Sequence, residues 1–350
     1  MGWQSIPVID LSEDPSTTCN KLKDAAESVG FFYLRGHGIA DDEFAAVFSA
    51  LKTFFALPME DKMKIHTSKT GGVRGYIGLF EQGNYGIDAA DQRAAEAAAT
   101  AADEGQAPHE ASDDEGVRLG EDGLPLDYKE VFTMGTELSE SHPHYHATLF
   151  APNVFPDGLP AWRDVIDCYY RRVWEVALRM YRLIALFLGL PEDHFGPFIT
   201  EPMNSMNCLH YPPYSGSHPR QLGIGAHTDY ECFTLLAQDG VPGLEIMNDD
   251  NEWVAVPPNG TDFVVNIGDM LARWSNGRFK STVHRARNPT AEHRYSIAYF
   301  CCCNFETPLT PLVNADHPKY PPVLAGVHML DRIHRANIAT QDGQKAVEAA

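Results

Sequence analysis

Apolar residues recur at three- and four-residue steps between residues 159 and 190, a spacing that predicts one long amphipathic helix. Eight charged side chains interrupt this stretch, so we do not expect it to cross a membrane. Nearer the start of the chain, Ser, Asp and Pro residues mark the beginnings of shorter helices. The predicted helices cover 16–29 with Ser16 as its cap, 41–55 with Asp41 and Asp42 as caps, 59–65 and 159–190.

Beyond residue 200 the pattern changes to short apolar segments separated by Pro, Gly and Asn. Such segments predict β-strands, for example at 243–247, 253–256 and 262–267. Helices followed by many short strands are typical of an α+β protein whose helices support a jelly-roll barrel, or double-stranded β-helix. We therefore expect residues 200–305 to form the barrel core and the long helix to lie against it.

Two histidines and one aspartate form the clearest candidate for a chemical site. On an extended strand, residues two apart point to the same side, so His227 and Asp229 can bind one ion together. Because 54 residues lie between Asp229 and His284, the third ligand is expected from a different strand. Two imidazoles and one carboxylate are the donor set of a facial-triad iron(II) site, which leaves three coordination positions open.

A second candidate lies ten residues beyond His284. Residues 288–292 predict a hairpin turn, after which Arg294 and Ser296 return on the neighbouring strand with their side chains on one face. A guanidinium and a hydroxyl at the end of a pocket suit a carboxylate, because charged bidentate hydrogen bonds fix its position and its orientation.

With several further segments, these residues resemble the iron(II)/2-oxoglutarate-dependent oxygenases, in the branch that includes isopenicillin N synthase and the plant-type soluble dioxygenases. The similar segments are 6–11, 30–38, 127–132, 209–213, 266–270 and 274–281. Because they extend from residue 6 to about residue 305, we expect one oxygenase domain over residues 1–350, with helices and strands in the region 1–150.

The resemblance implies the roles of individual residues. It places the distal carboxylate of the cosubstrate 2-oxoglutarate against Arg294 and Ser296, with Tyr211 nearby. It implies that 2-oxoglutarate is converted to succinate while O2 is activated to remove hydrogen from a small organic substrate in specialised metabolism. Hydroxylation, desaturation and ring closure all begin with that step. The iron(II) ligands that it implies are His227, Asp229 and His284.

The same resemblance implies a substrate pocket. Glu231 stands where the family usually has a small residue, and two interpretations remain open. Either its carboxylate meets an amine of the substrate, or the strand ends near Tyr230 and Glu231 points to water. Asn207 stands where some relatives carry Arg, which argues against transferring their substrates. The implied pocket residues are Arg74, Tyr76, Glu81, Phe132, Asn207, Leu209, Glu231 and Phe300.

Two other functions remain as alternatives at this point. The first is an iron oxidase that, like isopenicillin N synthase, uses O2 without an oxoacid. The second is a small-molecule-binding protein on the same barrel without catalytic activity, against which the intact iron and carboxylate motifs count.

Composition narrows the choice of partners. The net charge of −21 repels phosphate backbones and anionic lipids, so nucleic acid and membranes are not expected partners. Seven cysteines without paired spacing indicate buried thiols in a reducing, cytoplasmic compartment. We expect a monomer. His142, His144 and His146 alternate like metal ligands, but a polar loop is the preferred interpretation.

An acidic insertion is predicted at 88–123, where 11 acidic residues face 2 basic ones, Arg93 and Arg118. Three interpretations remain open. The alanine-rich stretch 94–102 favours a short solvated helix, the scarcity of apolar residues favours disorder, and the position between substrate-facing segments allows a lid.

Overall fold

The computed structural model describes residues 3–70, 73–83, 126–145, 147–214, 221–288 and 290–337. The predicted acidic insertion at 88–123 lies outside the described residues, and so does His146.

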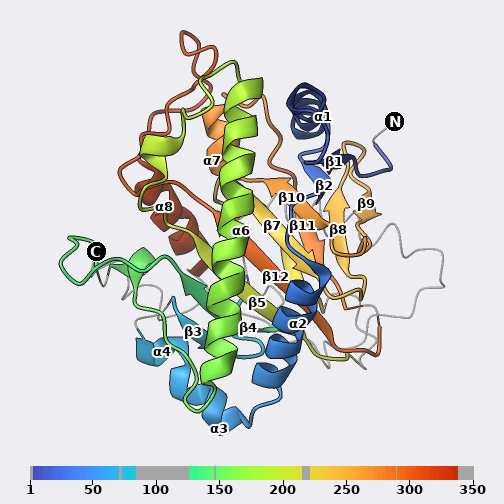
Figure 1. Ribbon diagram of the computed structural model, residues 1–350, viewed down its shortest axis with the longest axis vertical. Coiled ribbons are helices and arrows are strands. Elements are labelled where there is room, and N and C mark those ends of the chain that lie inside the picture. Colours follow the sequence, from blue (N-terminus) through green and yellow to red (C-terminus); the bar gives the residue numbers. More distant parts are fainter. Residues whose placement is uncertain are drawn as a thin grey trace, which may run out of the picture.

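Two β-sheets form the centre of the molecule (Figure 1). The larger has eight strands in the order β1-β2-β10-β7-β12-β5-β4-β3, and the smaller has four in the order β6-β11-β8-β9. Neighbouring strands are antiparallel except for β1 and β2, as a jelly roll requires. The strands are β1 Val8–Asp10, β2 Phe31–Arg35, β3 Gly75–Ile77, β4 Glu130–Gly135, β5 Ser205–Tyr211, β6 Ile224–His227, β7 Phe233–Gln238, β8 Leu244–Met247, β9 Trp253–Ala255, β10 Phe263–Ile267, β11 His284–Ala286 and β12 Arg294–Cys301.

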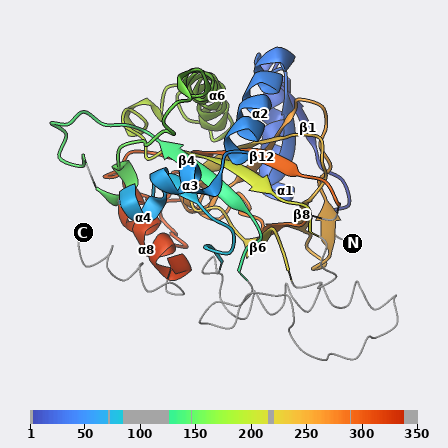
Figure 2. The ribbon, with the colours of Figure 1, turned by 90° about the horizontal axis from the view of Figure 1, so that it is seen from below.

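The helices confirm the predicted α+β class. In Figure 2, α1, α2 and α6 lie together on one side of the large sheet, opposite the strand β6 of the small sheet. The helices are α1 Pro15–Ser28, α2 Asp41–Phe55, α3 Met59–Lys62, α4 Thr67–Thr70, α6 Pro160–Phe187, α7 Asp269–Trp274 and α8 Ala325–Asn337, with 3-10 turns at Met63–Ile65, Thr148–Phe150 and Gly196–Phe198.

Two predicted helix caps were wrong. Helix α1 is capped by Asp14, whose carboxylate accepts a hydrogen bond of 3.0 Å from the backbone N–H of Thr17, so Ser16 lies within the first turn. Helix α2 begins after Ala40, whose N–H donates to the Glu43 carboxylate at 2.9 Å. In both cases a carboxylate near the helix start satisfies a backbone N–H that the helix leaves without a partner.

Helix α6 packs its apolar stripe against the large sheet, as its spacing predicts. Trp162 lies 5.2 Å from the ring of Phe54 and 4.9 Å from that of Phe132, measured between ring centroids. Its indole N–H donates to the Ala50 carbonyl at 2.8 Å, which satisfies the one polar group of this buried side chain. No helix among the described residues is long and apolar enough to cross a membrane.

The predicted hairpin between β11 and β12 was wrong. Strand β11 pairs with β6 and β8 in the small sheet, whereas β12 pairs with β5 and β7 in the large sheet. The connection therefore crosses from one sheet to the other. The Asn288 side chain donates to the Pro212 carbonyl at 2.5 Å and thereby ties this connection to the end of β5.

Candidate active site

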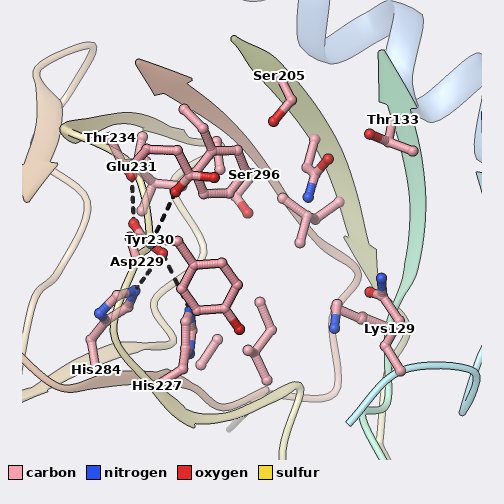
Figure 3. A pocket seen from close by; sticks show the side chains of 18 of the residues that line it. Lys129, Thr133, Ser205, His227, Asp229, Tyr230, Glu231, Thr234, His284 and Ser296 are labelled. Carbon is pink, nitrogen blue, oxygen red and sulfur yellow. Dashed lines mark hydrogen bonds and ion pairs between the residues drawn. The ribbon is translucent and has the colours of Figure 1, made fainter. Parts of the chain in front are cut away.

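Three side chains meet at one wall of a cavity of about 330 Å³, which is lined by residues of both sheets (Figure 3). His227 is directly opposite His284 in the pairing of β6 with β11, and their ring centroids are 4.1 Å apart. The Oδ1 atom of Asp229 lies 3.6 Å from His227 Nε2 and 3.7 Å from His284 Nε2. No other group of three such side chains in the described part of the chain brings its ligand atoms as close together.

The strand that carries the first ligand is shorter than predicted. Strand β6 ends at His227, so Asp229 lies in the loop that follows it and not on an extended strand. The backbone and the carboxylate of Asp229 are held by other contacts. The backbone N–H of Asp269 donates to the Asp229 carbonyl at 2.9 Å, and the side chains of Asn266 and Thr234 both donate to Asp229 Oδ2, the former at 2.6 Å.

These contacts aim the ligand atoms at a common point. His227 Nδ1 lies 2.9 Å from the Gly225 carbonyl and His284 Nδ1 lies 3.2 Å from the Thr282 carbonyl, so each ring presents Nε2 to the triad. Because Asn266 and Thr234 occupy Oδ2, Asp229 presents Oδ1. Two imidazole nitrogens and one carboxylate oxygen suit iron(II).

Electrostatics favour the protonation states that a metal needs. Burial, and then the neighbouring His284, lowers the pKa of His227 to about 3, so its ring is neutral near pH 7. Burial alone would raise the pKa of Asp229. The two imidazoles and the hydrogen bonds from Asn266 and Thr234 outweigh burial, so that this pKa lies below its usual value and the carboxylate is ionised.

The hydrogen bond from Thr234 provides a test of how the carboxylate is held. We expect Thr234→Val, which keeps the shape and removes the hydroxyl, to weaken iron(II) binding by roughly 10- to 100-fold, as typical losses of such partners do. Isothermal titration with iron(II) under nitrogen measures this change. Thr18→Val is the matched control, because Thr18 is also buried and its hydroxyl donates to the Asp10 carbonyl at 3.2 Å, away from the ligands. Equal iron(II) affinities in the unaltered protein, in Thr234→Val and in the control would contradict the role of Thr234 in holding the Asp229 carboxylate.

The predicted carboxylate site is also assembled. Arg294 is 1% exposed, and its guanidinium lies 4.6 Å from the centre of the Tyr211 ring. Its Nε donates to the Val241 carbonyl at 3.2 Å and its Nη2 to Gln238 Oε1 at 3.1 Å. Among the described residues Nη1 has no partner, and no carboxylate pairs with this cation. A buried guanidinium with an unused donor fits an anionic cosubstrate such as 2-oxoglutarate.

Two glycines allow this arrangement. A Cβ atom at Gly243 would lie 2.9 Å from Arg294 Nε, and a Cβ atom at Gly223 would lie 2.6 Å from the Tyr211 ring. Ser296 shares the cavity face with Tyr211, because β12 and β5 pair residue by residue, with Arg294 opposite Tyr211. Tyr211 and Ser296 line the cavity, whereas Arg294 is not among the lining residues and lies against the Tyr211 ring; that these three side chains bind the cosubstrate stays a prediction.

Six of the eight predicted pocket residues line the cavity, and two do not. Tyr76 is opposite Phe132 in the pairing of β3 with β4, and both face the helices. The Tyr76 hydroxyl donates to Glu130 at 2.6 Å, and Phe132 packs against Trp162, so the prediction for these two was wrong. Side chains alternate along a strand, and Tyr76 and Phe132 have the wrong parity. The six predicted residues that do line the cavity are Arg74, Glu81, Asn207, Leu209, Glu231 and Phe300.

The same alternation brings in residues that sequence reasoning missed. Lys129 and Thr133 precede and follow Val131 at two-residue steps, and Figure 3 shows both, with Ser205, on the wall across from the triad. Lys129 lies within the segment 127–132 and Thr133 directly follows it, so the two-residue alternation of a strand is the signal that points to both. Met329 and Ile333 of α8 also line the cavity, and no motif indicated that helix.

Lys129 belongs to a buried ion pair that reaches a metal ligand. Its ammonium contacts Asp127 Oδ2, and both residues are buried. Asp127 Oδ1 accepts a hydrogen bond of 3.0 Å from the Gly225 N–H, and the carbonyl of the same glycine contacts His227. Burial lowers the pKa of Lys129, while the Asp127 charge opposes that shift. The pair therefore ties the start of β4 to the strand that carries His227.

Glu231 points into the protein and not to water. It is 8% exposed, lines the cavity, and accepts a hydrogen bond of 3.1 Å from the Tyr230 N–H. Burial, and next the charge of Asp229, raises the pKa of its carboxyl to about 8. Within the described residues Glu231 forms no ion pair, and the charged side chains that act on it, Asp229 and Asp269, are both acidic.

The histidine-rich loop does not form a metal site among the described residues. His142 contacts Glu201 at 3.2 Å, and His144 contacts Glu306 and stacks on Phe305 with ring centroids 4.8 Å apart. All seven cysteines are free thiols; five are buried, Cys19 is partly buried and Cys168 is exposed.

Comparisons with known proteins agree with this geometry. The model of the 2OG-Fe(II) oxygenase superfamily matches residues 201–303, and that of the N-terminal region of non-haem dioxygenases in morphine synthesis matches residues 6–158. The 2-oxoglutarate-Fe(II) type oxidoreductase hxnY of Emericella nidulans is 32% identical, with 91% of this chain and 86% of the relative covered. The homoarginine-6-hydroxylase 2-ODD-C23 of Glycine max is 31% identical, with 89% of each covered.

Solved structures share the fold over almost the whole chain. A full-length protein of Neurospora crassa, crystallised in complex with alpha-KG, has a TM-score of 0.73 at 26% identity, with 99% of this chain and 96% of that chain covered. A 2OG-Fe(II) oxygenase family protein from Caulobacter crescentus has a TM-score of 0.75 at 26% identity, with 95% of this chain and 99% of that chain covered.

Proposed function

Because the chain belongs to the 2OG-Fe(II) oxygenase superfamily, we propose that it uses iron(II), 2-oxoglutarate and O2 to oxidise a small organic molecule in specialised metabolism. One observation carries the proposal. The two Nε2 atoms and the Oδ1 atom of the triad converge at the wall of a mostly apolar cavity.

Bound iron(II) and 2-oxoglutarate supply oxygen activation and hydrogen abstraction, with succinate and CO2 as coproducts. The chain's own residues hold and orient these groups. His227, Asp229 and His284 offer the three ligand atoms, while Arg294 fixes the far end of the oxoacid. Apolar side chains on the cavity wall keep water from the reacting carbon. They include Phe31, Leu209, Leu236, Leu244 and Phe300.

A metabolite screen tests this proposal. The enzyme is incubated with iron(II), 2-oxoglutarate, O2 and an extract of small molecules, and mass spectrometry follows which compound shifts. We expect a change of one oxygen atom or of two hydrogens, matched by an equal amount of succinate. Product formed without 2-oxoglutarate would favour the oxidase alternative. Complete absence of 2-oxoglutarate conversion would favour the binding protein without catalytic activity.

We further propose that the substrate carries a basic nitrogen near Glu231. The support is the burial of this carboxyl group without a cationic partner among the described residues, which a substrate amine would supply. The relative from Glycine max is named for the hydroxylation of homoarginine, which is a cationic compound.

Glu231→Gln separates this role from catalysis. The change keeps the shape but cannot form the carboxylate that would pair with a substrate ammonium group, so we expect the Michaelis constant for an amine substrate to rise by roughly tenfold or more, as loss of a charged hydrogen bond does. Conversion of 2-oxoglutarate in the absence of substrate is expected to stay unchanged. Glu245→Gln is the control, because Glu245 pairs with Arg285 at 2.6 Å and does not line the cavity. Unchanged kinetics in Glu231→Gln would remove this residue from the substrate site.

We also propose a reducing, cytoplasmic compartment, for which the seven free thiols are the support. The monomeric state stays a prediction that light scattering can check.

A further inference from the structure

Arg74 is a second buried cation with an unused donor. It is 4% exposed and lines the cavity. Its Nη2 donates to the Leu149 carbonyl at 2.8 Å and its Nη1 to the Val73 carbonyl at 3.3 Å. Its Nε has no partner among the described residues. Its hydrogen bonds go only to neutral carbonyl oxygens, and Glu137 is a nearby acidic group that forms no ion pair with it. A buried cation without a paired carboxylate is costly.

The guanidinium lies on the cavity face of β4. Gly135 is two residues beyond the cavity-lining Thr133, so it shares that face. A Cβ atom at Gly135 would lie 2.1 Å from Arg74 Nη2 and 2.5 Å from its Cζ. The absence of a side chain at Gly135 therefore leaves the space that the guanidinium fills.

Neutral polar side chains lie on the same cavity wall as Gly135. Thr133 is opposite Asn207 and Gly135 is opposite Ser205 in the pairing of β4 with β5, and Thr133, Asn207 and Ser205 all line the cavity. Figure 3 shows Thr133 and Ser205 across the cavity from the iron ligands and from Glu231. Hydroxyl and amide groups beside a guanidinium are the donors that hold a carboxylate.

The other charges in the cavity are already accounted for. Lys129 is paired with Asp127, and Glu81 is bound by His66 at 2.7 Å and by the Gly78 N–H at 2.8 Å. Arg294 is assigned to the cosubstrate. Arg74 is thus the cation of the cavity wall that is left for the substrate itself.

We propose that Arg74, with Thr133, Ser205 and Asn207, forms a subsite for a carboxylate of the substrate. This inference rests on the proposed function and names the substrate class. With an amine at Glu231 and a carboxylate at Arg74, on opposite walls, the substrate is an amino acid or a comparable small zwitterion. Its oxidised carbon lies between the two charged ends.

Paired acids and methyl esters test the subsite. The probes are α-amino acids with basic side chains and ω-amino acids of four to six carbons, each beside its methyl ester. Succinate release by the enzyme with iron(II), 2-oxoglutarate and O2 is measured against probe concentration. We expect the acids to act at concentrations at least about tenfold lower than their esters.

Arg74→Gln is expected to raise the half-saturating concentration of the acids by about 10- to 100-fold and to leave that of the esters unchanged. Arg74→Lys keeps the charge and is expected to retain part of the preference. Equal action of acids and esters on the unaltered enzyme would overturn the proposal. An equal shift for acids and esters in Arg74→Gln would also overturn it, because it would show a structural role only.

Arg179→Gln is the matched control. The Arg179 guanidinium also donates to two backbone carbonyls, those of His37 and Leu11, both at 3.2 Å, but it does not line the cavity. We expect this variant to lower the melting temperature without changing the preference for acids.

Conversion of 2-oxoglutarate without added substrate distinguishes failure of the carboxylate subsite from failure of the proposed function. If it occurs while neutral compounds are oxidised and acids are not, the subsite is wrong and the proposed function stands. If 2-oxoglutarate is converted neither alone nor with any probe or metabolite extract, the proposed function fails.

Discussion

Asp229→Ala is expected to abolish turnover. The change removes one of three protein ligands and leaves Asn266 and Thr234 without the acceptor that they share. We expect iron(II) affinity to fall by more than about 100-fold, beyond the loss typical of a hydrogen-bond partner of a ligand. Titration calorimetry with iron(II) and an oxygen electrode measure binding and turnover on the same sample.

Asp239→Asn is the control for that loss. Asp239 is a half-buried carboxylate of the barrel, and it accepts hydrogen bonds from the backbone N–H groups of Tyr295 at 2.8 Å and Val241 at 3.1 Å. It does not belong to the triad. A general loss of stability would affect both variants, whereas the proposed role predicts loss of iron binding in Asp229→Ala alone. Full oxygen consumption by Asp229→Ala would refute the metal assignment.

Arg294→Gln is expected to raise the 2-oxoglutarate concentration needed for half-maximal rate by about 10- to 150-fold. The basis is the loss of a charged hydrogen bond, which costs about 1.5 to 3 kcal/mol, where about 1.4 kcal/mol is a factor of ten. The maximal rate is expected to change less, because the iron ligands are untouched. Steady-state measurement of succinate at several 2-oxoglutarate concentrations gives both values.

Arg273→Gln is the matched control for Arg294. The Arg273 guanidinium also lies over a tyrosine ring, 5.0 Å from the centre of Tyr320, and donates to the Pro321 carbonyl at 2.9 Å. Tyr320, unlike Tyr211, does not line the cavity. An unchanged requirement for 2-oxoglutarate in Arg294→Gln would show that the cosubstrate binds elsewhere.

The metal site was accessible to sequence reasoning because its signal is local. The close spacing of His227 and Asp229 marks the pair, although Asp229 follows the end of β6, and the donor types select the metal. The pairing of His284 with His227 is a contact between distant segments, and the sequence predicted only that a different strand supplies it. The hairpin prediction was wrong for a related reason, because strand pairing also depends on contacts between distant segments. Residues 288–292 have turn chemistry, but whether a turn joins strands of one sheet or of two depends on the whole barrel.

The two wrong pocket predictions placed a side chain on the wrong face of its strand. Phe132 was expected in the pocket and packs against helix α6, while Thr133, its neighbour, faces the cavity. The segment itself was correctly placed. A shift of one residue along a strand exchanges the two faces, so a match of segments alone cannot tell which side chains meet the substrate.

The order of strands in the large sheet has a consequence for how the protein holds together. Strands from the region 200–305 occupy its middle, in the order β10-β7-β12-β5. Strands β1 and β2 cover one edge of this group, and β4 and β3 cover the other. Without them, β10 and β5 would each expose a row of unpaired backbone groups, which is a template for aggregation. Strands β1, β2, β3 and β4 therefore protect the central group on both flanks, so we expect the strands of the region 200–305 to aggregate when these four strands are removed.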